Sequence, residues 1–465
     1  MLARSEGDGD PFWAALPSRE LLAQHAWITG GTGAGKSFFV LGCLLQILKK
    51  SRHPVIVLDL KGELSDLLIR VGLPALAQTQ NGPRLLRRLR IIRPFDPRFV
   101  PELRITLPEP GVPREVQAFT IASAIEDALG DGLGIRMNRV FLKLVSLAIE
   151  QNQPLTMLQR WLEEPQAFAE AARQSSDPSI RQYAAGAFTR EARQSVDALV
   201  SRLDLFLFLE QTRLALSAES CVSFADCLDS GLTVISLGDP PSGAERAARF
   251  WAGILVGRIT RAILSRRLTE RSKQTLVLFE EFQEAISGRQ SEQFGRLLAL
   301  ARHKKVGLWF INQQVAQLDA ALVKLLRTNT GLEAVFRSSF EDAKTIAHAL
   351  PVATDPKKAR VERAALLEEI PRLPNRVFYL WLKGRPFRAQ KVRSPRLNLD
   401  RLRLAGLELP DDIAAFLEQG TVARPREEIA AALERAGEDE PRRSTAVGFL
   451  RVVERTGDGR FPELG

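Results

Sequence analysis

The sequence predicts an α/β fold: a doubly wound, mostly parallel sheet with an inserted all-α domain. Apolar runs such as residues 55–58 and 275–279 are continuous, as in parallel strands that are covered on both faces. Helical segments follow these runs along the chain, as expected for such a sheet. Between them, residues 113–220 carry apolar side chains at helical spacing and almost no strand signals.

The first element is a strand at residues 26–29, which is followed by the sequence GGTGAGKS and a Leu-rich helix at residues 38–50. This is the pattern G-x-x-x-x-G-K-[ST] of a phosphate-binding loop, or P-loop, in its expected strand-to-helix context. In such a loop Lys36 reaches the β- and γ-phosphates and the Ser37 hydroxyl binds Mg²⁺. A glycine-rich loop that matches by chance explains this context less well. The predicted nucleotide-binding residues are Gly30, Gly31, Thr32, Gly33, Ala34, Gly35, Lys36 and Ser37.

Polar groups follow the later strands. Asp59 ends the run from residue 55, Glu280 and Glu281 end the run at 275–279, and Asn312 and Gln313 follow the run at 306–311. Ligands of such sheets bind at the carboxyl ends of the strands. We therefore expect Asp59 to contact nucleotide, Glu280 to hold Mg²⁺, Glu281 to orient the attacking water and Gln313 to sense the γ-phosphate. The alternative for each is an ordinary polar strand end.

Four segments are expected: a first part of the core at 1–112, the helical insertion at 113–220, a second part of the core at 221–395 and a tail at 396–465. The tail mixes short amphipathic pieces with prolines, which indicates a small appendage or partial disorder. The second part of the core should contain strand 232–237, helix 244–266, strand 275–279, helix 290–303, strand 306–311, helix 315–327, strand 332–336, helix 340–350 and an antiparallel pair near 376–392.

Composition narrows the function classes. The 465 residues are 45% hydrophobic with a net charge of +10, which allows a large core and favours a polyanionic partner, although a basic chain can also be merely soluble. Three cysteines and four histidines show no metal spacing, so no zinc site is expected. No signal peptide and no apolar run long enough to span a bilayer is visible, which predicts a cytoplasmic protein.

The motifs together resemble the HerA/FtsK superfamily of ring ATPases. Within it, residues 57–64, 279–283 and 312–318 resemble the "DPKGEL", "DEFQ" and "NQ…AQL" elements of TraD/TraG-type conjugative coupling proteins. The resemblance implies a RecA-like motor that assembles as a hexamer and threads DNA through its pore, driven by ATP. It also implies that Arg302 acts on the ATP of a neighbouring subunit. Leu60 stands where coupling proteins have Pro and Glu280 where they have Asp, and neither membrane helices nor a HerA N-terminal barrel precede the motor.

The leading hypothesis is an ATP-driven DNA translocase with ATP and Mg²⁺ as cofactors. A motor that moves along any DNA needs phosphate contacts, which carry no sequence information. An alternative is an ATP-switched assembly or adaptor subunit that recruits a nuclease or a secretion-channel partner, and a third is a secretion ATPase that moves protein. Any one basic side chain can also be a solvated charge. The candidate DNA contacts are Arg289, Lys304, Lys305, Lys324 and Arg327.

Overall fold

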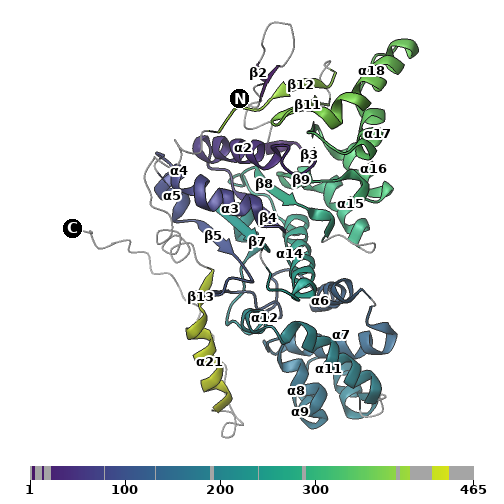
Figure 1. Cartoon of the computed structure of the whole chain (residues 1–465). Helices are drawn as coiled ribbons and strands as arrows, with labels where there is room; N and C mark the ends of the chain where they lie inside the picture. The colour runs from purple at the N-terminus through teal and green to yellow at the C-terminus, as the bar shows by residue number, and fades with distance from the viewer. Residues whose placement is uncertain are drawn as a thin grey trace, which may run out of the picture.

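The computed structural model describes residues 3–5, 13–14, 22–77, 79–130, 132–188, 193–238, 240–284, 290–383, 388–397 and 422–438. Within them, eleven strands form one sheet in the order β2-β1-β12-β11-β10-β3-β9-β8-β4-β7-β5 (Figure 1). The strands from β10 to β5 in this order are parallel, and the remaining four pair antiparallel. Their bounds are β1 Ala3–Ser5, β2 Trp13–Ala14, β3 Ala26–Thr29, β4 Val55–Asp59, β5 Leu89–Ile92, β7 Leu232–Ser236, β8 Thr275–Glu280, β9 Val306–Asn312, β10 Leu332–Val335, β11 Val377–Leu382 and β12 Gln390–Arg393. The predicted α/β fold is confirmed.

Helices cover both faces of the parallel strands, which is why these strands are continuous apolar runs. Every residue of β4, β7, β8 and β9 is buried. One face packs against α2 (Lys36–Lys50), α3 (Glu63–Leu67), a π-helical turn (Leu68–Gly72) and α4 (Leu73–Ala77), while α5 (Gly82–Leu86) follows at the sheet's end. The other face packs against α14 (Glu245–Ser265), α15 (Gln290–Leu300), α16 (Ala320–Asn329) and α17 (Phe340–Ala349), and α18 (Pro356–Glu369) packs on α17.

The strand register brings the predicted site residues into one row at the carboxyl edge of the sheet. Thr29 pairs with Asn312 across β3 and β9, and Asp59 pairs with Glu280 across β4 and β8. Glu280 in turn pairs with Ile311 of β9. The loop after β3 therefore begins beside the polar ends of β9, β8 and β4, which is the place where open parallel sheets bind ligands.

Helices α6 to α13 form the segment that we call the helical lobe, below the sheet in Figure 1. The long helix α14 reaches from the sheet to this lobe and packs against α6. Arg261 of α14 donates two hydrogen bonds, of 2.7 and 3.2 Å, to the carboxylate of Glu109, just before α6. The lobe comprises α6 (Arg114–Leu129), α7 (Gly134–Glu150), α8 (Met157–Glu163), α9 (Pro165–Arg173), α10 (Pro178–Gln182), a π-helical turn (Tyr183–Ala187), α11 (Arg193–Leu207), α12 (Glu210–Leu216) and α13 (Phe224–Asp229).

Part of the predicted tail folds onto the first half of the chain. Strand β13 (Ala423–Pro425) pairs antiparallel with β6 (Phe99–Pro101), and α21 (Arg426–Glu438) follows it. Arg424 lies 3.3 Å from Glu102 and 3.3 Å from Glu219, so it joins the strand pair to the end of the helical lobe. The boundaries at 113–220 and 396–465 remain a proposal. No described helix has both the length and the apolar character needed to cross a membrane.

Three predicted helices have different bounds. The helix after the P-loop begins at Lys36, two residues earlier than predicted, because Gly35 can take the left-handed conformation at its N-cap. The helix predicted at 290–303 ends at Leu300 and continues as a 3₁₀ turn (Ala301–Lys304). The helix predicted from 315 begins at Ala320, because the Asp319 carboxylate accepts a 2.7 Å hydrogen bond from the Leu322 N–H and caps it.

Candidate functional site

The P-loop is held in place by the segments that follow β10 and precede β11. The Gly31 N–H donates to the Arg337 carbonyl at 2.6 Å, and the Arg376 N–H donates to the Ala34 carbonyl at 3.0 Å. Gly35 has a φ of 101°, which other residues adopt only with strain. The loop is therefore a fixed arc that runs from the buried end of β3 into the first turn of α2.

The start of α2 has the properties of an anion site. No side chain caps this helix end, and no acidic residue lies in its first turn. Its first N–H groups have no carbonyl one turn earlier, and the helix dipole adds partial positive charge there. Lys36 is 7% exposed as a residue, and its ammonium group donates to the carbonyls of Gly30 and Gly31, the latter at 3.1 Å. Burial lowers the pKa of Lys36, while the carboxylates of Glu281 and Glu280 oppose that shift.

Glu280 is the last residue of β8 and is 5% exposed. Burial, followed by the neighbouring charges of Asp59 and Glu281, raises the pKa of Glu280 well above its usual range. Its Oε2 atom is buried and has no hydrogen-bond partner in the described part of the chain. A buried carboxyl oxygen without a partner, beside the P-loop, is the kind of group that a bound cation would satisfy.

Glu281 has a backbone conformation that is rare for a residue with a side chain. Its φ is 56°, and its N–H donates to the Ile311 carbonyl at 2.8 Å. The carboxylate is 1% exposed, accepts a 2.6 Å hydrogen bond from Gln283 and lies 3.7 Å from the Lys61 ammonium. The turn thus brings a second carboxylate to the same edge, next to Glu280 rather than on the opposite face of the sheet.

Asp59 is fully buried, but its carboxylate faces its own chain. It accepts hydrogen bonds from the N–H groups of Lys61, Gly62 and Ser65, at 3.1, 2.8 and 2.7 Å. These bonds hold the tight turn from β4 into α3. In this structure Asp59 therefore supports the site by fixing the turn after β4. Its predicted contact with nucleotide stays a prediction.

Gln313 lies directly across from the P-loop. The Thr32 hydroxyl donates a 3.0 Å hydrogen bond to Gln313 Oε1. The preceding Asn312 is fully buried and accepts a 2.8 Å hydrogen bond from Trp27 Nε1, which fixes the end of β9 against β3. A pocket of about 300 Å³ opens between these groups, lined by Thr32, Gly33, Gly35, Lys36, Ser37, Phe38, Glu63, Leu67, Glu280 and Gln313.

Sequence reasoning missed several members of this site, among them Phe38 at the start of α2. Glu63 and Leu67 of α3 line the pocket, and Lys61 pairs with Glu281. The available signal was their place just after Asp59, because residues that follow a strand's carboxyl end lie at the ligand edge of the sheet. The pairing of Lys61 with Glu281 depends on the left-handed backbone conformation of Glu281, which no sequence pattern predicted.

Comparison with known proteins agrees with this geometry. The family model of the central domain of helicase HerA matches residues 11–212, which include the P-loop, Asp59 and most of the helical lobe. The resemblance to HerA-type P-loop ATPases is confirmed. No curated protein matches the chain.

The solved structures that are similar to this chain include a plasmid coupling protein and VirB4. Plasmid coupling protein TrwB with the GTP analogue GDPNP has a TM-score of 0.54 and 16% identity, covering 81% of this chain and 86% of TrwB. TrwB with ADP and Mg²⁺ has a TM-score of 0.51 and 16% identity, again covering 81% of this chain and 86% of TrwB. VirB4 of Thermoanaerobacter pseudethanolicus has a TM-score of 0.55 and 14% identity, covering 86% of this chain and 97% of VirB4. At such identities these likenesses show a shared fold.

Arg302 lies away from the P-loop of its own chain. It precedes β9, whereas Gln313 follows it, and seven strand residues span about 23 Å at about 3.3 Å each. Arg302 is exposed and donates a 2.9 Å hydrogen bond to the Asn329 carbonyl. Within this chain the structure therefore does not bring Arg302 together with Lys36, Glu280 and Glu281.

The candidate DNA contacts lie in different environments. Lys304 donates to the Arg266 carbonyl at 2.9 Å, and Lys305 donates to the Ser272 carbonyl at 3.1 Å. Arg327 donates to the Thr345 carbonyl at 3.1 Å and stacks over the Trp27 ring at 5.7 Å. Lys324 is exposed, and Arg289 lies outside the described residues. DNA binding by these side chains stays a prediction.

Proposed function

We propose that this HerA-type protein is an ATP-driven DNA translocase that hydrolyses ATP between the subunits of a hexameric ring. One observation carries the proposal: a P-loop lysine, the glutamate that ends β8, the glutamate that follows it and a glutamine after β9 meet at one edge of the sheet. The same edge holds an uncapped helix end suited to a phosphate. TrwB, which shares the fold, is a plasmid coupling protein that was solved with ADP and Mg²⁺.

The residues of the pocket fit ATP with Mg²⁺. Ser37 lines the same pocket as Glu280, whose Oε2 is buried without a partner. The Ser37 hydroxyl and the Glu280 carboxylate would hold the metal ion, because Mg²⁺ prefers oxygen ligands. An Mg²⁺ ion held by these residues would supply positive charge that offsets the negative charge developing on the phosphate.

Each protein group then has a defined part in hydrolysis. Lys36 exchanges the carbonyls of Gly30 and Gly31 for phosphate oxygens, which accept a stronger, charge-assisted hydrogen bond. Glu281 takes a proton from the attacking water, and Gln283 and Lys61 hold its carboxylate in position. Gln313 already bonds to Thr32 of the P-loop, so it is placed to respond to the γ-phosphate.

A ring supplies what one subunit lacks. Arg302 lies at the far end of β9 from its own pocket, so it can reach transferring phosphate only in a neighbouring subunit. The net charge of +10 favours a polyanion such as DNA as the moving partner. A nuclease or secretion-channel partner, cytoplasmic location and the hexamer itself belong to this proposal.

The test is the ATPase rate of the full chain with and without DNA at low salt. We expect DNA to stimulate hydrolysis, and Glu281→Gln to lower the rate about 10²- to 10⁴-fold while nucleotide binding persists. Glu368→Gln, an exposed glutamate on α18, serves as the matched control and should hydrolyse like the wild type. A rate that does not respond to DNA contradicts the translocase.

Mass photometry separates the motor from the ATP-switched adaptor. Rings that form with ATP support the motor, whereas monomers under every condition favour the ATP-switched adaptor. Mixing Arg302→Ala subunits with Glu281→Gln subunits tests the shared site. If Arg302 acts on the neighbour's ATP, mixed rings regain activity because some interfaces carry both wild-type residues, and no recovery argues against the shared site.

A further inference from the structure

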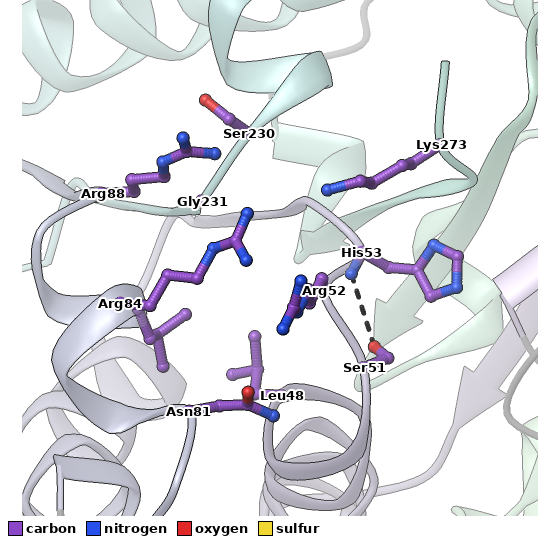
Figure 2. Close-up of a pocket in the computed structure, with 11 residues that line it drawn as sticks. Leu48, Ser51, Arg52, His53, Asn81, Arg84, Arg88, Ser230, Gly231 and Lys273 are labelled. Carbon is purple, nitrogen blue, oxygen red and sulfur yellow. Dashed lines mark hydrogen bonds between the residues drawn. The ribbon is translucent and has the colours of Figure 1, made fainter. Parts of the chain in front are cut away.

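A second pocket opens at the opposite, amino edge of the sheet, where the parallel strands begin (Figure 2). We call it the basic pocket. Its walls come from the segments just before β4, β5, β7 and β8, together with α2 and α5. Because parallel strands all begin at the same edge, four segments that are distant in sequence converge there. It is lined by Leu48, Ser51, Arg52, His53, Asn81, Arg84, Leu85, Arg88, Ser230, Gly231 and Lys273.

The charge of this pocket has one sign. Arg52, Arg84, Arg88 and Lys273 line it, and no aspartate or glutamate does. Figure 2 shows Arg84, Arg52 and Lys273 extending into one space, with Arg88 at its rim beside Ser230. Burial, followed by the charges of Arg84, Arg88 and Arg52, lowers the pKa of Lys273. Four cations that repel one another at close range form a site that an anion would stabilise.

Neighbouring cations at the same edge show the contrast. Arg266 donates to the carbonyls of Lys304, Leu228 and Lys273 and pairs with Asp229 at 2.8 Å. Lys304 and Lys305 also donate to backbone carbonyls. For the four cations of the basic pocket, the described part of the chain shows no hydrogen bond or ion pair of the side chain. These four charges therefore do not hold backbone carbonyls or carboxylates in place, as the charges of Arg266, Lys304 and Lys305 do.

Helix ends do not account for these cations either. Arginine and lysine often serve the last carbonyls of a helix. At the end of α2, however, the Lys49 carbonyl accepts from Asn81 at 2.9 Å, and the Ile47 carbonyl accepts from the N–H and hydroxyl of Ser51 at 2.9 and 2.8 Å. These carbonyls are already satisfied by groups other than the four cations.

We propose that the basic pocket binds a phosphate group, either as the free ion or as part of a nucleic-acid strand. The pocket measures about 40 Å³, roughly three times the space that one water needs, so it suits a small oxyanion and excludes a whole nucleotide. Guanidinium groups pair with phosphate oxygens through two parallel hydrogen bonds, and an ammonium adds a point charge. The site is separate from the ATP pocket, because the two lie at opposite edges of the sheet.

The experiment uses the full chain with Lys36→Ala, which removes the P-loop's own grip on phosphate. Inorganic phosphate is titrated at constant ionic strength, and the melting temperature and the heat of binding are recorded. We expect saturable stabilisation. Adding Arg84→Gln and Lys273→Gln should weaken the apparent affinity at least about tenfold, because each lost charge-assisted bond contributes substantially to phosphate binding.

Arg87→Gln with Arg271→Gln is the matched control, because it removes the same charge from exposed neighbours outside the pocket. Its phosphate affinity should stay within about twofold of the Lys36→Ala parent, and Arg84→Lys with Lys273→Arg should retain most of the binding. No saturable effect of phosphate, or equal weakening in the control pair, overturns the proposal. Because no variant in this set can use its P-loop, the result is independent of ATP hydrolysis.

A second arm identifies the source of the phosphate. A fluorescent single-stranded oligonucleotide is titrated into the same proteins. If the Arg84 and Lys273 pair weakens both titrations more than the control pair does, the phosphate is one carried by a strand. If only the titration with inorganic phosphate is affected, the site takes the free ion. Weakening of the oligonucleotide alone, without saturable phosphate binding, overturns a site built for the phosphate group.

Discussion

The two edges of the central sheet use the same strands for opposite electrostatic purposes. At the carboxyl edge, Lys36 lies near the charges of Glu280 and Glu281, and the Glu281 carboxylate is held by an ion pair with Lys61 and a hydrogen bond from Gln283. At the amino edge, the basic pocket gathers cations alone. Glu280 ends β8 and Glu281 and Lys61 follow strand ends within two residues, so the strand register largely places these three groups. The amino-edge groups come from loops and short helices, so their meeting follows from tertiary packing.

The largest expected effect tests whether phosphate chemistry belongs to the carboxyl edge. Helix α2 carries Lys36 at that edge and the exposed Lys50 at its other end. Lys36→Ala should lower ATP hydrolysis about 10²- to 10³-fold, as for the loss of one transition-state donor. Lys50→Ala should leave the rate within about twofold. Steady-state ATPase assays measure both, and equal losses would remove the distinction between the edges.

Glu280 gives a prediction for stability and pH. Burial, Asp59 and Glu281 raise its pKa above the ordinary 4.5, so the folded protein keeps this proton to higher pH than the unfolded chain does. The stability that depends on the proton is fully present below about pH 4.5 and is lost as pH rises through the raised pKa. In EDTA and without nucleotide, the Glu280→Gln variant should unfold at a higher temperature than the wild type near pH 8.

The expected gain is on the order of 1 kcal/mol, in the range of a buried, poorly satisfied polar group. Thermal unfolding from pH 5 to pH 8 measures it, with Glu368→Gln as the exposed control. A pH dependence that Glu280→Gln leaves unchanged would mean that this carboxyl ionises freely. Glu280 and Glu281 would then be equivalent, contrary to the separate parts that we assign to them.

Lys61 should have a moderate effect, because it acts through Glu281. Its side chain is 35% exposed and lies 3.7 Å from the carboxylate. Pairs of this kind contribute about 0.2–1 kcal/mol, so Lys61→Ala should lower kcat about two- to fivefold with little change in KM. Lys61→Arg should restore most of the rate. A change in KM alone would show that Lys61 binds nucleotide instead of positioning Glu281.

The smallest effect sharpens the picture of the amino edge. Without phosphate, Lys273→Gln should stabilise the protein by a few tenths of a kcal/mol, as expected when like charges are relieved. Added salt should reduce this gain, because ions screen partly exposed charges. Thermal unfolding at 20 mM and 500 mM NaCl compares the stability of the Lys273→Gln variant with that of Arg271→Gln. Destabilisation by Lys273→Gln would reveal a partner within the fold and weaken the case for an anion site.

The sequence predicted the carboxyl edge because each of its features is local. A P-loop needs its glycines in order, and a buried strand that ends in two acids places them beside it. Even so, Asp59 turned its carboxylate to its own backbone, which a strand end alone does not reveal. The basic pocket was invisible because Arg52, Arg84, Arg88 and Lys273 are scattered over separate segments. The strands β1 and β2 were also missed, since runs of two and three residues carry too little pattern.

The pairing of β6 with β13 has a consequence for biosynthesis. Every other described strand pair is complete once β12 has been made, whereas β13 and α21 come last along the chain. During synthesis on the ribosome, β6 therefore lacks its partner strand β13 while the helical lobe and the rest of the sheet are made. A growing chain with an unpaired strand at its surface attracts other strands. A chain broken off before β13 would therefore leave this edge open and would be prone to aggregate.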